Sequence, residues 1–227
     1  MTAISDNLAA LLESIRAFEK KYGRDPGSVK LLAASKKQSV DSIKAAFDAG
    51  QCCFGESYLQ EAAGKFSALH NLPIEWHFIG PVQSNKTRKI AEFFSWVHSV
   101  DSMRIVKRLN DQRPDHLPPL NICIEVNVSG EASKSGVLMD QVLGLALYCQ
   151  NLPRIRLRGL MAIPAIHHRF DHQRQEFHKL QSLFLYLREH HFSVDTLSMG
   201  MSDDFEAAIA EGSTIVRIGT ALFGRRV

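Results

Sequence analysis

Hydrophobic and polar positions along the chain follow two alternating patterns. Short apolar runs typical of buried strands are separated by longer segments whose apolar residues recur at helical spacing. The expected strands are 29–34, 51–54, 75–79, 96–100, 121–128, 155–163, 196–199 and 215–218. The expected helices between them are 40–49, 58–69, 85–94, 103–110, 138–149, 172–190 and 204–211. Helical spacing within residues 1–23 predicts one more helix before the first strand.

This alternation predicts a parallel sheet, because parallel neighbours need a crossover connection. Eight such units in 227 residues predict a single (β/α)8 TIM barrel with an extra N-terminal helix, forming one domain over residues 1–227. A doubly wound open sheet is the competing architecture, and it usually has a glycine-rich first turn. The first turn here is Ser35-Lys-Lys-Gln38, which contains no glycine and favours the barrel.

Composition narrows the classes of function. The net charge of +3 and the charged fraction of 22% are too mild to indicate nucleic-acid or membrane binding. No apolar run could span a bilayer and the N-terminus does not resemble a signal peptide, so we expect a cytoplasmic protein. The four cysteines form no CxxC pair, and we found no metal-ligand spacing. We therefore expect free thiols and no metal site.

The end of the first expected strand carries the most informative side chain, Lys36. Because side chains alternate along a strand, Lys36 shares a face with Leu32 and the small Ala34. A partly desolvated lysine has a lowered pKa and becomes a nucleophile that can form a Schiff base. Taken alone, the stretch fits an ordinary solvated lysine better, so its interpretation depends on the rest of the chain.

Two later loops have the composition of phosphate sites. In a TIM barrel, active sites lie at the carboxyl ends of the strands, and phosphates commonly bind after strands seven and eight. The seventh expected strand runs into Ser198-Met-Gly-Met-Ser202, and the eighth ends in Arg217-Ile-Gly-Thr220. Each loop offers a glycine, a hydroxyl and backbone N–H groups, which a phosphate needs. The structural alternatives are tight turns at the glycines and a helix N-cap at Ser202 or Asp203.

Arg217 lies between apolar residues of a strand, where an arginine is costly unless it is paired. One interpretation is a salt bridge to Glu125 of the fifth expected strand. The other is that Arg217 faces the ring nitrogen of a pyridine. A guanidinium only donates hydrogen bonds, so it would keep that nitrogen unprotonated and weaken the ring as an electron sink.

For His77, a hydrogen-bonded core position is favoured over one facing the barrel mouth.

Short motifs carry a family resemblance along the chain. They are Leu32-Ala-Ala-Ser-Lys-Lys37, Phe54-Gly-Glu-Ser-Tyr-Leu-Gln-Glu61, Trp76-His-Phe-Ile-Gly-Pro-Val-Gln-Ser-Asn-Lys86, Ile124-Glu-Val-Asn-Val128, Lys134-Ser-Gly136, Arg158-Gly-Leu-Met-Ala-Ile-Pro164, Leu197-Ser-Met-Gly-Met-Ser-Asp-Asp204 and Val216-Arg-Ile-Gly-Thr-Ala-Leu-Phe-Gly-Arg225. On these stretches the chain resembles the pyridoxal-phosphate homeostasis protein family, which has the alanine-racemase N-terminal type of barrel. One departure is Ser57, where the family usually has Asn.

The resemblance implies the cofactor pyridoxal 5′-phosphate (PLP) and a role for each matching residue. Lys36 matches the Schiff-base lysine, and Arg217 matches the arginine near the pyridine nitrogen. The residues that match the phosphate-binding loops are Ser202, Gly219 and Thr220. Those that match residues lining the cofactor are Met161, Ser198, Met199 and Gly200.

The function that the resemblance implies is PLP binding in intracellular vitamin B6 homeostasis, without firm catalytic turnover. PLP-dependent apo-enzymes are candidate partners. The alternative is a PLP-dependent amino-acid racemase or lyase, but two-base racemisation needs an acid/base on each face of the substrate. Racemases with this barrel resemble dimers that bring a tyrosine from a second domain, whereas this chain stops after the eighth unit. We therefore expect a non-enzymatic monomer. A third possibility is a phosphate-binding barrel without PLP, in which Lys36 acts only electrostatically.

Overall fold

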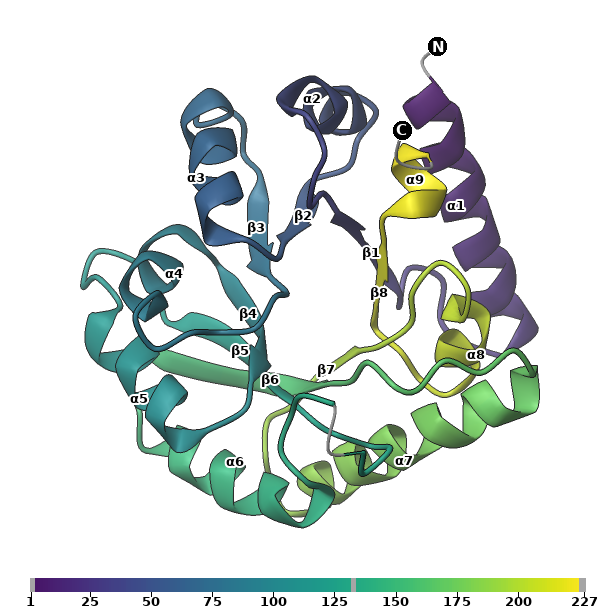
Figure 1. The fold of residues 1–227 in the computed structure, drawn as a ribbon. Helices are drawn as coiled ribbons and strands as arrows, with labels where there is room; N and C mark the ends of the chain where they lie inside the picture. The colour runs from purple at the N-terminus through teal and green to yellow at the C-terminus, as the bar shows by residue number, and fades with distance from the viewer. Residues whose placement is uncertain (1–2, 132–133, 225–227) are drawn as a thin grey trace.

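Eight parallel strands of the described residues, 3–131 and 134–224, close into a barrel in sequence order, and β8 pairs with β1. The computed structural model in Figure 1 shows the helices arranged around this ring of strands. The predicted TIM barrel is therefore confirmed. Arg225, which ends the last matching motif, and the extreme ends of the expected domain lie outside the described residues.

The strands are β1 (Lys30–Ala34), β2 (Cys53–Glu56), β3 (Glu75–Phe78), β4 (Trp96–Val100), β5 (Leu120–Glu125), β6 (Ile155–Met161), β7 (Thr196–Ser198) and β8 (Ile215–Ile218). The helices are α1 (Ala3–Lys21), α2 (Val40–Asp48), α3 (Leu59–Ala68), α4 (Thr87–Phe93), α5 (Met103–Gln112), the 3₁₀ turn η1 (Met139–Gln141), α6 (Val142–Gln150), α7 (Phe170–Glu189), α8 (Phe205–Ala210) and α9 (Thr220–Phe223). Every expected strand forms. The short helix α9 was not expected.

Local sequence accounts for several of these boundaries. Helix α2 begins after Ser39, whose hydroxyl accepts a hydrogen bond from the Ser42 amide at 3.1 Å. It ends before Gly50, which has a φ of 104° that side chains rarely adopt. The fifth expected strand stops early at Glu125: the Val126 amide still donates to the Met161 carbonyl at 2.8 Å, and Val126 bridges to Val137.

Apolar side chains outside the barrel form two clusters. One fills the space between strands β1–β5, β8 and helices α1–α5, and the other lies between β5–β7 and helices α6–α8. The predicted N-terminal helix α1 packs on the outside against α2, α8 and α9. Phe18 of α1 meets Phe205 of α8 edge to face, with ring centroids 5.5 Å apart. Among the described helices, none is both long and apolar enough to cross a bilayer.

Candidate functional site

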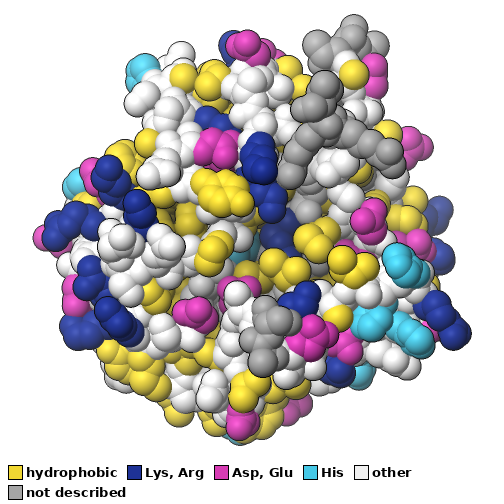
Figure 2. Space-filling view, viewed as in Figure 1, with side chains coloured by type: hydrophobic (Ala, Val, Ile, Leu, Met, Phe, Trp, Pro, Cys, Tyr) yellow, Lys and Arg dark blue, Asp and Glu magenta, His cyan; other side chains and the backbone are white. Residues whose placement is uncertain are grey.

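Lys36 lies in the turn that leaves β1 at the carboxyl end of the barrel, and its side chain is half-buried. The turn is tied to the next strand, since the Ser35 amide donates to the Gly55 carbonyl at 2.9 Å. It also approaches β8. A Cβ added to Gly219 would lie 3.0 Å from the Ala34 carbonyl oxygen. The predicted Schiff-base lysine and one predicted phosphate loop are therefore neighbours. Figure 2 shows Lys or Arg side chains in a hollow at the middle of the visible face.

A buried ion-pair cluster braces this turn from the side of α3. The ammonium of Lys65 donates to the Ser35 carbonyl and to Glu56 Oε1, both at 2.8 Å. The Ser35 hydroxyl donates to the same Glu56 oxygen at 2.6 Å. Glu61 accepts from Lys65 and from the backbone amide of Lys37, which adopts a φ of 63°. Burial raises the pKa of Glu56, and the hydrogen bond from Lys65 opposes that rise. The backbone is thus held on each side of Lys36 in the sequence, at the Ser35 carbonyl and at the Lys37 amide.

Arg217 projects from β8 into the barrel and is 5% exposed. Its guanidinium donates to the Ser198 carbonyl at 2.6 Å, to the Ser198 hydroxyl at 2.8 Å and to the Ala162 carbonyl at 2.9 Å. Among the described residues it forms no ion pair with Glu125, so the salt-bridge interpretation is wrong. Burial lowers the pKa of Arg217 to about 10, against the attraction of Asp204 and Glu125. The cation is therefore held in place by neutral acceptors.

A chain of hydrogen bonds runs from Arg217 through the barrel interior. Ser198 Oγ lies 2.8 Å from His98 Nδ1, His98 Nε2 lies 2.8 Å from His77 Nδ1, and His77 Nε2 lies 2.8 Å from Glu75 Oε1. The two ends determine its direction, because an arginine can only donate and a carboxylate can only accept. Each histidine then carries its proton on Nε2. Burial lowers the pKa of both imidazoles, that of His98 well below its usual value, so both are neutral.

Both phosphate-loop candidates lie at the same end of the barrel as Lys36. The Arg217 amide donates to the Gly200 carbonyl at 2.9 Å, which joins the loop after β7 to strand β8. Gly200 has a φ of 96°, and a Cβ there would lie 2.6 Å from the Cβ of Ala208. Helix α8 has Asp204 as its N-cap, so the expected cap at Ser202 or Asp203 is wrong. Ser202 is half-buried and Thr220 is exposed.

The remaining predicted lining residues divide into two sets. Met161 and Ser198 are register partners at the ends of β6 and β7, and both are buried in the barrel interior. Met199 points the other way, because its side chain belongs to the outer cluster against the helices. The structure therefore does not bring the Met199 side chain to the interior. Ser57 follows β2, and its carbonyl oxygen lies only 2.2 Å from where a Cβ on Gly80 would be.

Sequence reasoning missed the residues that support the Lys36 turn and the hydrogen-bond chain from Arg217. Glu56 and Glu61 lie inside a matching motif but had no role assigned, and the spacing of Glu61 and Lys65 is a helix-pair signal. His98 had one available signal, which is a histidine in the middle of an expected strand with apolar residues at both ends; the structure buries every position of that strand.

The fold and this site define a class: a TIM barrel with a lysine at the end of β1, a buried arginine on the neighbouring strand β8, and glycine loops after β7 and β8. The model of the family described as "Alanine racemase, N-terminal domain" matches residues 7–227, and the chain belongs to this family.

Relatives are similar over nearly their full length. A protein of Pseudomonas aeruginosa named pyridoxal phosphate homeostasis protein is 54% identical over 226 residues, covering 100% of this chain and 97% of that protein. The structure of PipY from Synechococcus elongatus with PLP bound is 33% identical, with a TM-score of 0.82 over 97% of this chain and 100% of that chain. Alanine racemase from Corynebacterium glutamicum shares the fold at 17% identity and a TM-score of 0.68, and 61% of its chain is covered.

Proposed function

We propose that this protein binds PLP at the carboxyl end of the barrel, holds it as a Schiff base on Lys36, and serves intracellular vitamin B6 homeostasis. The observation that carries the proposal is the state of Arg217. It is a buried cation held by neutral acceptors at the end of the barrel where Lys36 and both glycine loops lie. The name of the Pseudomonas relative and the PLP bound to PipY support the same assignment.

The residues present fit this cofactor. The close approach of Gly219 to the β1 backbone leaves space that a Cβ would fill, and Ser202 and Thr220 place hydroxyls on the two loops that would hold the phosphate. Bound PLP supplies an aldehyde that condenses with amines and a ring that withdraws electrons. Arg217 would donate to the ring nitrogen, and Met161, Ser198 and the backbone at Gly200 and Met199 would line the ring.

We also propose that the protein carries PLP rather than turning over a substrate. Lys36 can serve as a base on one face only, and an arginine that donates to the ring nitrogen weakens the ring as an electron sink. PLP-dependent apo-enzymes in the cytoplasm are the proposed acceptors, and the proposed carrier is a monomer. An amino-acid racemase or lyase is the alternative, favoured by the fold shared with alanine racemase.

The first test compares Lys36 with its neighbour. Wild-type protein loaded with PLP should be yellow, and borohydride reduction followed by peptide mass mapping should place the adduct on Lys36. Lys36→Ala should lose the colour and the adduct. Lys37→Ala is the matched control, because that side chain is exposed and the residue is held through its backbone amide. An adduct mainly on Lys37 would refute the assignment.

The second test separates carrier from enzyme. In deuterated water, PLP-loaded protein should exchange the Cα protons of common amino acids no faster than free PLP does, as followed by proton NMR. Stereo-inverting exchange that disappears in Lys36→Ala would make the protein a racemase and overturn the carrier proposal.

A further inference from the structure

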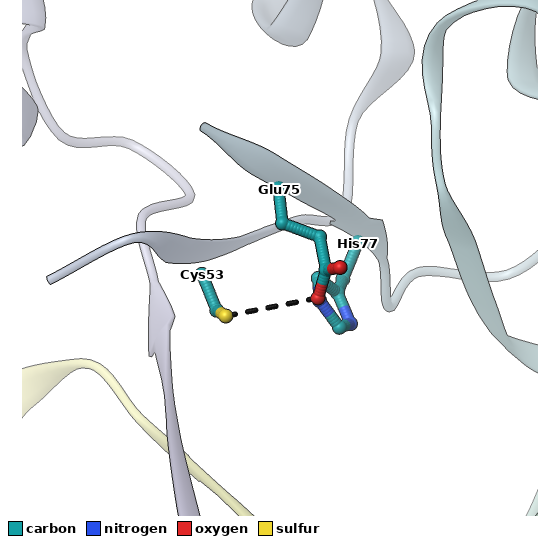
Figure 3. A group of neighbouring side chains, drawn as sticks. All are labelled: Cys53, Glu75 and His77. Carbon is teal, nitrogen blue, oxygen red and sulfur yellow. Dashed lines mark hydrogen bonds and ion pairs between the residues drawn. The ribbon is translucent and has the colours of Figure 1, made fainter. Parts of the chain in front are cut away.

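Three metal-ligating side chains meet at the amino ends of β2 and β3, away from the Lys36 end. Cys53 and Glu75 are register partners on neighbouring strands, and His77 lies two residues after Glu75 on the same face. Their ligand atoms all lie within 4.8 Å of one another, and Figure 3 shows the three side chains converging. Sequence spacing did not reveal this set, because the sheet register brings Cys53 to Glu75.

One of the distances between the ligand atoms is that of a tetrahedral metal site, and another is shorter. Zinc bonds of about 2.0–2.3 Å to oxygen, nitrogen and sulfur place neighbouring ligand atoms roughly 3.3–3.8 Å apart. Cys53 Sγ lies 3.7 Å from Glu75 Oε1, and His77 Nε2 lies 2.8 Å from the same oxygen. Separating the imidazole and the carboxylate slightly would admit an ion. Strand positions make such a set rigid, and the Glu75 side chain, 44% exposed, leaves an entry from solvent.

The second nitrogen of His77 already has the support that metal-bound histidines have. Its Nδ1 lies 2.8 Å from His98 Nε2, and both rings are buried. A histidine bound to a metal almost always donates its other N–H to a partner, which orients the ring. His98 can accept that bond by changing tautomer and donating from Nδ1 to Ser198 Oγ, 2.8 Å away. This partner distinguishes the cluster from a chance surface grouping.

We propose that Cys53, Glu75 and His77 form a site for a thiophilic divalent cation of the zinc class, with water in the fourth position. Thiolate, carboxylate and imidazole together favour zinc or cobalt over magnesium or calcium, which take oxygen ligands. On binding, the Cys53 thiol releases its proton to solvent. His77 stays neutral but moves its proton from Nε2 to Nδ1, and His98 moves its own from Nε2 to Nδ1. The hydrogen bond between His77 and Glu75 is therefore replaced by the metal, and the bonds from His77 to His98 and from His98 to Ser198 reverse their direction.

Cobalt(II) titration of the chelator-treated, PLP-free protein under reducing conditions tests the ligand set. One equivalent should give a thiolate-to-cobalt charge-transfer band and the intense d–d bands of a tetrahedral ion, and zinc should displace it. Cys53→Ser should remove the charge-transfer band. Glu75→Gln, at a half-exposed position, should weaken cobalt and zinc binding in calorimetry by at least the roughly 10- to 100-fold that the loss of an outer-shell partner costs.

Cys52→Ser is the matched control, because Cys52 is the adjacent, exposed thiol and lies near the Gly50 carbonyl instead. It should bind cobalt as wild type does. Equal loss in both serine variants, or no charge-transfer band in wild type, would refute the site.

Nitrogen-15 NMR of the imidazoles gives a second readout. Zinc should move the protons of both His77 and His98 to Nδ1, and unchanged tautomers with zinc bound would place the ion elsewhere. Neither readout depends on PLP binding.

Discussion

Two buried carboxylates end strands at the carboxyl end of the barrel, Glu56 in β2 and Glu125 in β5, and they differ in how close a buried cation lies. Glu56 contacts its cation directly, with Lys65 Nζ at 2.8 Å. The charge of Arg217 acts on Glu125 from a longer distance, and none of the ion pairs among the described residues joins the two side chains. Burial raises the pKa of both groups, and that of Glu125 rises to about 7 through burial and the nearby charge of Asp101.

This difference in contact distinguishes a structural cluster from a candidate binding site. Lys65 is in direct contact with Glu56 and Glu61, and the same cluster binds the Ser35 carbonyl and hydroxyl in the Lys36 turn. Arg217 and Glu125 are buried without neutralising each other. Perturbed groups of this kind concentrate where a ligand binds. The Glu56–Lys65 cluster therefore positions Lys36, whereas the charges of Arg217 and Glu125 are available to a bound ligand.

Removing Lys65 should have the largest effect on stability. Lys65→Met leaves the buried Glu56 carboxylate without its cation and the Ser35 carbonyl without a donor, and should cost about 3–5 kcal/mol in urea unfolding. Lys44→Met is the control, because Lys44 pairs with Asp48 on the surface and such pairs contribute about 0–1 kcal/mol. Similar losses in the two variants would show that the Glu56–Lys65 pair is not a brace.

Glu125 should make the stability of the protein depend on pH. Its pKa is about 7 in the folded state against the ordinary value of 4.5 for a glutamate, so the folded state holds the proton more tightly over that interval. Stability of PLP-free protein should therefore fall as pH rises from 4.5 to 7, by about 2–3 kcal/mol. Glu125→Gln cannot ionise and should lose this part of the decline. Urea unfolding at several pH values measures it, and parallel profiles for the two proteins would contradict the assignment.

The smallest expected effect concerns the phosphate loop beside Arg217. Ser202→Ala removes one hydroxyl donor to a charged group, so PLP should bind roughly tenfold more weakly, or about 1.5 kcal/mol. Pyridoxal, which lacks the phosphate, should bind as before and serves as the control ligand in absorbance titrations. Equal weakening of both ligands would show that Ser202 supports the loop rather than the phosphate.

The sequence predicted the barrel because each of its eight strands is an apolar run flanked by helical periodicity, and both signals are local. It also predicted that Lys36 and the loops after β7 and β8 would share one end, since the carboxyl ends of parallel strands lie together. Of the two interpretations of Arg217, the salt bridge to Glu125 is wrong, and the contact with a pyridine nitrogen stays a prediction. A buried arginine requires acceptors, but its sequence context does not say whether these are carboxylates or carbonyls.

What the sequence by itself determined is which residue follows which strand. Lys36, Ser202 and Arg217 therefore reach the same end of the barrel as a direct consequence of strand order. Only the tertiary structure decided which residues of different elements meet. His98 meets Ser198 across 100 positions of sequence, Lys65 folds back onto Ser35, and Cys53 meets Glu75. The contacts of His98 and Cys53 depend on strand register and on closure of the sheet, and one residue of slip would turn these strand side chains to the opposite face.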